Sequence, residues 1–253
     1  MSVRGAALLA AVAAAVVAAA AGCGGGGSPT APAEVQATAP AAVAPPAFLD
    51  GYFSTPRAAG AWAEGQTYVI VPSWDDDAQA AAAALSQRHA FALVSAHHCF
   101  GGKRAEWEAC WAKTRAWMAP LEATGRVLGV YVIDEPLHNG ISQGDAAAAV
   151  ARVRADGYRT MVAETYSMYA KTLRETGSRL DFGADWYGLT AYDTKPEWVT
   201  DRYREDGRLN VVFCSSDDDA NGRRLAATAR ARGLFRWSLD MGAAAHSMPR
   251  RLP

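Results

Sequence analysis

Eight short apolar runs recur along the chain, beginning near residue 48. Each is rich in β-branched or aromatic residues, as strands are, and their starts lie about 19 to 36 residues apart. We expect eight strands, at Phe48–Ser54, Thr67–Trp74, Phe91–Phe100, Val127–Pro136, Thr160–Met168, Phe182–Tyr192, Leu209–Ser216 and Gly233–Asp240.

The stretches between these runs favour helices. One helix is expected over Ala105–Gly125. Its apolar face would carry Trp107, Trp111, Thr114, Met118 and Leu121. Ser142 and Asp145 are typical of a capping box at the start of another helix, which Gly157 would end.

The alternation of strands and helices predicts an α/β protein with a parallel sheet and helices outside it. Eight units are the number that closes a (β/α)8, or TIM, barrel, and the roughly 207 residues of 47–253 make a small single domain of that fold. A doubly wound open sheet is the alternative, but no strand is followed by a Gly-rich phosphate loop.

The first 46 residues do not have the composition of a folded domain. Residues 1–22 have one basic residue, Arg4, then an Ala-rich apolar stretch and a small-residue exit, as a signal peptide does; a retained membrane anchor is the alternative. Ala20-Ala21-Gly22-Cys23 resembles the bacterial lipobox, with Ala20 where Leu is common, which implies lipidation of Cys23. Residues 23–46 then form a flexible tether.

These features predict an exported protein, lipid-anchored in the cell membrane or outer membrane and facing away from the cytoplasm. Without Arg4 the chain has 24 basic and 26 acidic residues, which argues against a nucleic-acid partner. Contact with the membrane is expected through the lipid alone. We expect a monomer and no cofactor.

Three further cysteines follow Cys23. In an oxidising compartment a Cys99–Cys110 disulfide is plausible and would leave Cys214 unpaired. Three buried free thiols are an equally open alternative. The spacing does not resemble a zinc site.

In a TIM barrel the chemistry lies at the carboxyl ends of the strands. Here those ends are rich in carboxylates and aromatic rings, the groups that bind sugar hydroxyls and stack on sugar faces. The predicted substrate-binding residues are Trp74, His97, His98, Tyr131, Asp134, Tyr187, Tyr192 and Trp237. The predicted partner is an oligosaccharide or polysaccharide.

The segment Val-Tyr-Val-Ile-Asp-Glu-Pro at 130–136 resembles the fourth-strand motif of the clan of retaining glycosidases with (β/α)8 barrels. In that clan Asn-Glu-Pro presents the general acid/base, and Asp-Glu-Pro is a variant in glycosidase-like barrels. The resemblance implies Glu135 as the proton donor, a role that needs a partly buried carboxyl with a raised pKa. Asp134 alternates with it on a regular strand, so we expect a supporting hydrogen bond from Asp134.

Two other segments agree with the clan. Residues 185–192 resemble its sixth-strand pattern Asp-x-x-Gly-x-Asn-x-Tyr, with Thr190 where Asn is usual. Residues 235–238 resemble its eighth strand, where a Trp commonly floors the sugar site; that residue would be Trp237.

The seventh strand departs from the clan because it lacks the Glu that serves as nucleophile. A second carboxylate is needed about 5–5.5 Å from the first for retention, or about 6.5–9.5 Å for inversion. Asp217 and Glu164 are the candidates. The acidic runs at 75–77 and 217–219 precede helices, however, and can instead cap them.

Two other kinds of chemistry remain open. His97 and His98 could hold a metal with Asp134 or Glu135, although no metal is our expectation. Cys214 with either histidine could form a thiol nucleophile. The leading hypothesis is a glycoside hydrolase acting outside the cytoplasm; the alternative is a glycosidase-like barrel that binds glycans without hydrolysing them.

Overall fold

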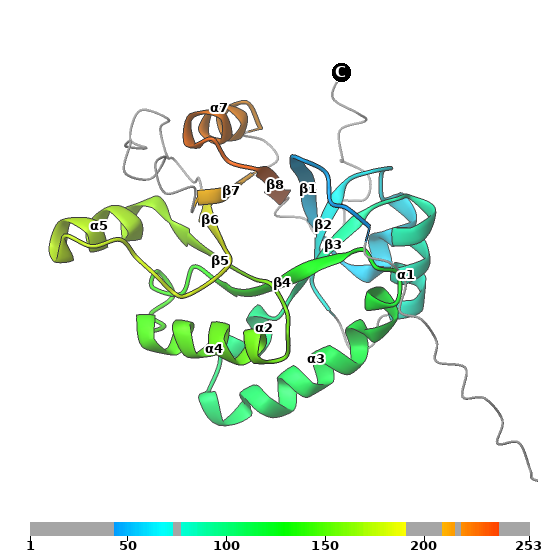
Figure 1. The fold of residues 1–253 in the computed structure, drawn as a ribbon, viewed down its shortest axis with the longest axis horizontal. Helices are drawn as coiled ribbons and strands as arrows, with labels where there is room; N and C mark the ends of the chain where they lie inside the picture. The colour runs from blue at the N-terminus through cyan, green and yellow to red at the C-terminus, as the bar shows by residue number, and fades with distance from the viewer. Residues whose placement is uncertain (1–42, 73–76, 191–208, 216–218, 238–253) are drawn as a thin grey trace, which may run out of the picture. The chain divides into compact units, whose positions relative to one another are not determined.

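The computed structural model describes residues 43–72, 77–190, 209–215 and 219–237. Eight parallel strands pair in chain order, and β8 closes on β1 to complete the barrel (Figure 1). The strands are β1 Leu49–Ser54, β2 Thr67–Ile70, β3 Phe91–Ser95, β4 Val127–Asp134, β5 Thr160–Thr165, β6 Trp186–Thr190, β7 Leu209–Ser215 and β8 Gly233–Trp237. The predicted TIM barrel, with all eight of its strands, is confirmed.

Helices follow the strands on the outside of the barrel. The longer ones are α1 Ala78–Gln87, α3 Trp107–Glu122, α4 Gln143–Ala155, α5 Tyr166–Thr176 and α7 Asp219–Ala229. The short ones are η1 Pro56–Ala61, α2 His97–Phe100 and η2 Arg104–Glu106. In Figure 1, α3 and α4 run along the side of the sheet near β4, and α7 lies beside β7 and β8.

Several strands end earlier than predicted. The third apolar run continues to Phe100, but β3 stops at Ser95 and the run continues as α2. Tyr166 likewise begins α5 rather than extending β5. A continuous apolar run does not by itself distinguish a buried strand from a buried helix, which explains these boundaries.

Side chains on alternating positions of the strands divide between two cores. The residues that fill the barrel interior are Leu49, Phe53, Val69, Leu93, Tyr131, Met161, Ala163, Val211, Phe213 and Phe235. Gly188 of β6 makes room for the ring of Phe213, because a Cβ at Gly188 would lie 2.3 Å from Cε2 of that ring. The larger core lies between the strands and the surrounding helices.

The helix faces follow the sequence pattern. The buried residues of α3 are the five that were predicted: Trp107, Trp111, Thr114, Met118 and Leu121. Ser142 caps α4 by accepting a hydrogen bond from the Asp145 N–H at 3.0 Å, as in a capping box, while its hydroxyl donates to the Asp145 carboxylate at 2.8 Å. Asp77 caps α1 by accepting from the N–H groups of Gln79 and Ala80.

A buried arginine ties α7 to the seam between β8 and β1. The Arg236 side chain is only 1% exposed, forms ion pairs with Asp50 and Asp219, and lies over the ring of Tyr52. Asp219 also accepts from Arg223 at 2.8 Å. Since a buried guanidinium must be paired, these carboxylates have a structural role here.

Cys99 and Cys110 form a disulfide that joins α2 to α3. Of the two alternatives left open by the sequence, the structure therefore has the bridge. Cys214 is buried, forms no disulfide with a described residue, and packs beneath α7, where a Cβ at Gly222 would lie 2.5 Å from its Sγ. It lies on β7 and His98 lies after β3, on the far side of the barrel order, so they do not form a thiol–imidazole pair.

The predicted signal peptide and Cys23, and most of the predicted tether, lie outside the described residues. Within the described ranges, no helix has the length and apolar character needed to cross a membrane.

Replacing both Cys99 and Cys110 by Ser should lower the free energy of unfolding by about 3 kcal/mol. The disulfide closes a loop between residues 11 apart and so lowers the conformational entropy of the unfolded chain, and the variant loses this restriction. Urea unfolding measures this difference. Wild type with a reductant should match the double variant, which itself should not respond to reductant. Equal urea midpoints for oxidised wild type and the variant would contradict the expectation.

Candidate active site at the carboxyl ends of the strands

All eight strands are parallel, so their carboxyl ends meet at one mouth of the barrel. Ser95, Thr165 and Thr190 occupy interior-facing positions at the ends of β3, β5 and β6, as their register with interior residues requires. Asp134 ends β4 and pairs in register with Ala163, another interior residue. Polar groups therefore replace the apolar filling at this end.

A shift in register brings Asp134 to the interior. The pairing of β4 with β5 slips by one residue between Tyr131 and Ile133. In a regular strand, residues three apart face opposite sides, but across this bulge Tyr131 and Asp134 face the same side. The Tyr131 hydroxyl accordingly donates a hydrogen bond to Oδ1 of Asp134.

Glu135 follows in the left-handed region of the backbone, with φ of +45°. A non-glycine residue rarely adopts this conformation, and such strain is found preferentially at functional sites. The turn brings the Glu135 carboxyl close to the Asp134 carboxyl and to the Thr190 hydroxyl at the mouth, since both groups influence its pKa. Asp134 and Glu135 thus share one site, where a regular strand would have separated them.

Glu135 is buried without full hydrogen bonding. Its side chain is 8% exposed, and its Oε1 has no hydrogen-bond partner of standard geometry in the described part of the chain. The Thr190 hydroxyl, which is 2% exposed, lies near the Glu135 carboxyl and lowers its pKa as a hydrogen-bonding neighbour, but it too has no partner of standard geometry among these residues. The two groups are therefore close but poorly paired, and a polar ligand at the mouth would complete their hydrogen bonding.

Burial and like charge act together on this pair of carboxyls. Desolvation raises the pKa of Glu135, the Asp134 charge raises it further, and the nearby Thr190 hydroxyl and His138 lower it in part. Desolvation also raises the pKa of Asp134, opposed by the Tyr131 hydrogen bond and by His97. A carboxyl with a raised pKa can hold its proton closer to neutrality and act as a general acid.

Glu164, predicted as a candidate second carboxylate of the site, instead binds backbone N–H groups. It is fully buried, and its Oε2 accepts from the N–H groups of Leu137 at 2.7 Å and His138 at 3.4 Å. Its Oε1 accepts from the Thr165 N–H at 2.7 Å. Both oxygens are therefore engaged in fixing the loop that follows Glu135.

That loop is also closed by its own backbone. The Glu135 N–H donates to the Ala163 carbonyl at 2.8 Å, and the Glu135 carbonyl accepts from Asn139 at 2.9 Å. Ile141 donates to the Pro136 carbonyl at 2.7 Å. Together with Glu164, these bonds hold the left-handed turn in place.

The two histidines of α2 contact different elements: His97 contacts the end of β4, and His98 contacts α3. His97 Nδ1 accepts a hydrogen bond from the Asp134 N–H at 3.1 Å, so its neutral ring carries the proton on Nε2. His98 lies within 3.4 Å of the Thr114 hydroxyl of α3. His97 therefore belongs to the mouth, and His98 to the packing of α2 against α3.

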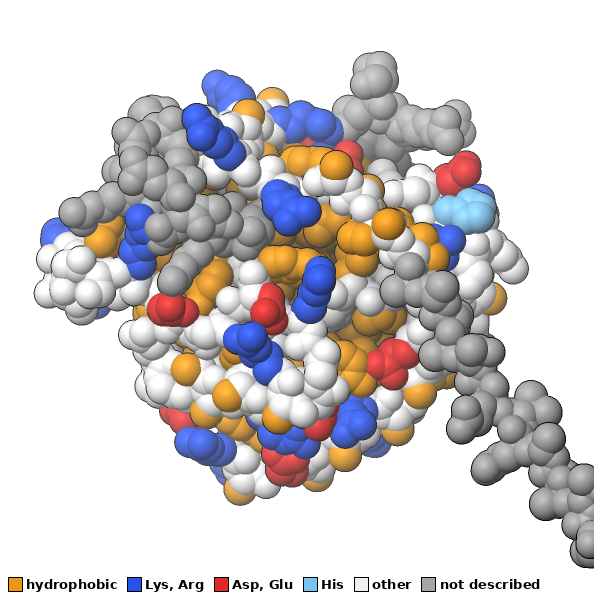
Figure 2. Space-filling model, viewed as in Figure 1, with side chains coloured by type: hydrophobic (Ala, Val, Ile, Leu, Met, Phe, Trp, Pro, Cys, Tyr) orange, Lys and Arg blue, Asp and Glu red, His pale blue; other side chains and the backbone are white. Residues whose placement is uncertain are grey.

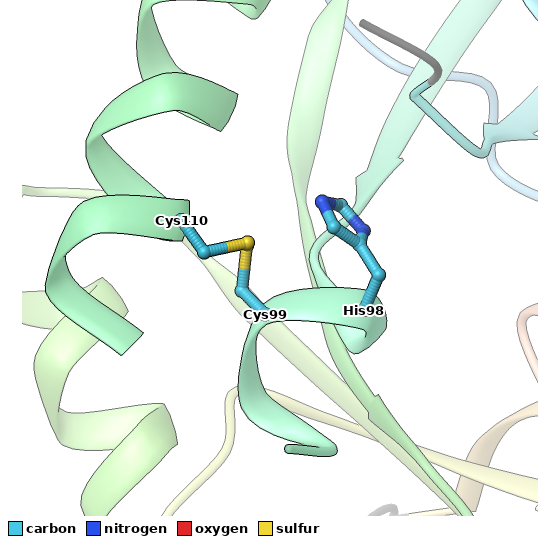
Figure 3. Close-up of side chains that lie close together, drawn as sticks. All are labelled: His98, Cys99 and Cys110. Atoms are coloured by element: carbon cyan, nitrogen blue, oxygen red, sulfur yellow. A yellow bond between two sulfur atoms is a disulfide. The ribbon is translucent and has the colours of Figure 1, made fainter. Parts of the chain in front are cut away.

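His98, Cys99 and Cys110 lie close together, as Figure 3 shows, with potential ligand atoms within 4.8 Å of one another. The two sulfur atoms are bonded to each other. A cysteine binds a metal as its thiolate, so Cys99 and Cys110 cannot serve as metal ligands while they form the disulfide.

Tyr131 forms the floor of the mouth. It is 1% exposed and packs edge-on against Phe53 and tilted against Phe213. Tyr187 was predicted beside it, but its ring lies in the outer core and its hydroxyl donates to Asp181 and accepts from the Phe182 N–H. These partners precede β6, so we leave Tyr187 out of the candidate site.

The remaining predicted residues are not placed here. Trp74, Tyr192 and Asp217 lie outside the described residues, and Trp237 is the last residue of β8 with its side chain outside the description. From the sequence, Thr190 was noted only as a departure from the usual Asn, and His138 was not noted at all. The available signal for His138 was that it follows Glu135 by only three residues.

A hollow lies at the opposite end of the barrel, at the starts of the strands. It is lined by Pro45, Pro46, Ala47, Leu49, Leu128, Arg159, Trp186, Val211 and Arg232. Figure 2 shows apolar surface in the middle of one face with basic side chains around it. In TIM-barrel enzymes the chemistry lies at the carboxyl ends of the strands, so this hollow at the opposite end is not part of the candidate site.

No protein-family model matches the chain, and no curated protein matches it. The solved structures similar to it include two of D-allulose 3-epimerase from Methylomonas sp., one of them in complex with D-allulose. Their TM-scores are 0.43, with 13% and 14% identity over 77% and 78% of this chain and 86% and 85% of those chains. An AP endonuclease, family 2, from Brucella melitensis has a TM-score of 0.42 and 11% identity over 74% of this chain and 92% of the other. These similarities are too low to bear on function.

Glu135→Gln should stabilise the protein at pH 7 by about 1 kcal/mol, because it replaces a buried charge by a neutral group. The pKa of Glu135 is higher in the folded than in the unfolded chain, so its proton favours folding. That stability is complete below the unfolded pKa and is lost as the pH rises through the folded pKa. The advantage of the variant should therefore grow with pH.

Urea unfolding of both proteins between pH 4 and pH 8 measures this. The exposed Glu175, replaced by Gln, is the matched control and should show no such trend. An advantage for Glu135→Gln that stays constant or shrinks as the pH rises would contradict the proposed environment of Glu135.

Proposed function

We propose that this chain is a glycosidase-like barrel that hydrolyses carbohydrate outside the cytoplasm, with Glu135 as the general acid/base. The observation that carries the proposal is the Glu135 carboxyl itself: 8% exposed, at the mouth, with one oxygen unpaired among the described residues and a raised pKa. A leaving sugar oxygen requires such a protonated carboxyl.

The surroundings of Glu135 support this role. Asp134, Thr190 and the Nε2–H of His97 add hydrogen-bonding groups at the same end of the barrel. The Glu164 carboxylate fixes the following loop and so positions Glu135 indirectly. The Tyr131 ring provides a rigid base beneath Asp134.

Glu135→Gln should lower kcat on a cleaved oligosaccharide by 10²- to 10⁴-fold, since the amide cannot donate and recover a proton. The assay is a panel of oligosaccharides and polysaccharides incubated with wild type, Glu135→Gln and Glu175→Gln. The Glu175 variant should retain wild-type rates. Undiminished turnover by Glu135→Gln would remove Glu135 from the chemistry.

A second candidate function is glycan binding without hydrolysis. It is favoured by one observation: both Glu164 oxygens are occupied by backbone donors, so Glu164 does not provide a second free carboxylate. In the same panel, saturable binding with no product from wild type would support this alternative.

The proposal includes export and lipid anchoring, which rest on the pattern of residues 1–46. Cys23→Ala should move the protein from the membrane fraction to the soluble extracytoplasmic fraction of the producing bacterium, because the acylated residue is lost. Fractionation followed by immunoblotting measures this. A variant that stays membrane-bound to the wild-type extent would overturn the lipid anchor.

A further inference from the structure

The short helix α2 connects the disulfide to the mouth of the barrel. It spans His97–Phe100 directly after β3, so its first residue lies at the mouth. Cys99 of the same turn is bonded to Cys110 of α3, and Figure 3 shows the bridge between the two helices. A helix of a single turn has little stability of its own, so tertiary contacts must hold α2 in place.

His97 connects the position of α2 to the end of β4. Its Nδ1 accepts the Asp134 N–H at 3.1 Å, immediately before the left-handed turn at Glu135. The His97 ring also packs closely on the end of its own helix, because a Cβ at Gly101 would lie 3.3 Å from the Cε1 atom of that ring. The backbone before the turn is therefore supported by His97, as the loop after it is supported by Glu164. A displacement of α2 would reach the turn through this ring.

Ring packing and the disulfide together hold α2 against α3. The Phe100 ring packs edge-on against Trp107, with centroids 5.3 Å apart, and tilted against Trp111 at 5.9 Å. Apolar packing is non-directional and tolerates small shifts. The bridge does not, because its covalent geometry restricts the distance between the Cα atoms of Cys99 and Cys110, which is 5.3 Å here. The bridge is thus the stricter of these two constraints on α2.

We infer that the Cys99–Cys110 disulfide is a positioning element of the candidate site, acting through His97, so that the mouth is fully formed only in the oxidised protein. The expected effect on activity rests on the function proposed above, whereas the expected effect on His97 is independent of it. An exported chain would then complete its site after reaching an oxidising compartment.

A dithiol reductant opens the bridge by thiol–disulfide exchange. The S–S bond between Cys99 and Cys110 takes up two electrons and two protons and becomes two thiols, while the two thiols of the reductant lose them and form one disulfide. The two cysteine side chains can then move apart, although Phe100 still packs against α3. We expect the hydrogen bond from the Asp134 N–H to His97 to lengthen or break, because such bonds weaken steeply with misalignment.

¹⁵N NMR of the histidine rings of the full chain tests this for any substrate, with the His97 signal assigned by its loss in His97→Gln. In the oxidised protein, Nδ1 of His97 should have the shift of an unprotonated nitrogen that accepts a hydrogen bond. After reduction with dithiothreitol, both ring nitrogens should move towards the shifts of a free imidazole, which averages its two tautomers. His89, which precedes β3 at the opposite end of the barrel, is the internal control and should not move. Reoxidation should restore the His97 signal.

Replacing both Cys99 and Cys110 by Ser should give the His97 signal of reduced wild type without any reductant. Met118→Ala removes a buried side chain from α3 and keeps the bridge, so it is the matched control for lost stability and should keep the oxidised signal. On a cleaved oligosaccharide, reduction should lower the kcat of wild type by about tenfold or more, because a small misplacement of site groups has an effect of this size. The measurements on wild type do not depend on the folding of any variant.

The same His97 signal in oxidised and reduced wild type would overturn the inference, as would an equal change of that signal in Met118→Ala. Equal kcat in the two redox states would also overturn it and would leave the proposed hydrolysis standing. If the His97 signal changes as expected but wild type cleaves no glycan, the positioning role of the bridge stands and the proposed hydrolysis fails.

Discussion

The left-handed backbone of Glu135 is the constraint on which the mouth of the barrel depends. Such a conformation costs about 1–3 kcal/mol for a residue with a side chain, and the surrounding bonds must offset it. The Glu135 N–H bond to Ala163 and the two N–H bonds that Glu164 accepts from the next loop provide this support. Without the turn, Asp134 and Glu135 would face opposite sides of β4, and no pair of carboxyls would exist.

The sequence was sufficient for the architecture because the barrel depends on local patterns. Apolar runs gave the strands, the spacing of Trp107, Trp111 and Met118 gave the buried face of α3, and Ser142 with Asp145 gave a helix start. The ends of β3 and β5 were placed too late because buried helices and buried strands share one apolar signature. Eight strand–helix units then leave a closed barrel as the simplest arrangement.

The site was less accessible to sequence reasoning because it depends on register between strands. Glu135 and Asp134 were identified, but the slip that turns Asp134 inward is set by the pairing of β4 with β5, and the left-handed backbone of Glu135 then keeps the next side chain at the mouth. Tyr187, assigned to the sugar site by its place in the sequence, lies in the outer core because it alternates with the interior positions Gly188 and Thr190 of β6. The role of Glu164 depends on where a loop 27 residues earlier returns to it, and no local pattern reports that.

The central claim is that folding places the Glu135 carboxyl in a poorly solvated site next to a second carboxyl. Its pKa measured by NMR titration of ¹³C-labelled glutamate side chains, with the Glu135 signal assigned by its loss in Glu135→Gln, tests this most directly. We expect a pKa raised above the ordinary value of a glutamate carboxyl, because burial and the neighbouring Asp134 charge disfavour the ionised form. A Glu135 signal that titrates at or below that ordinary value would contradict the account.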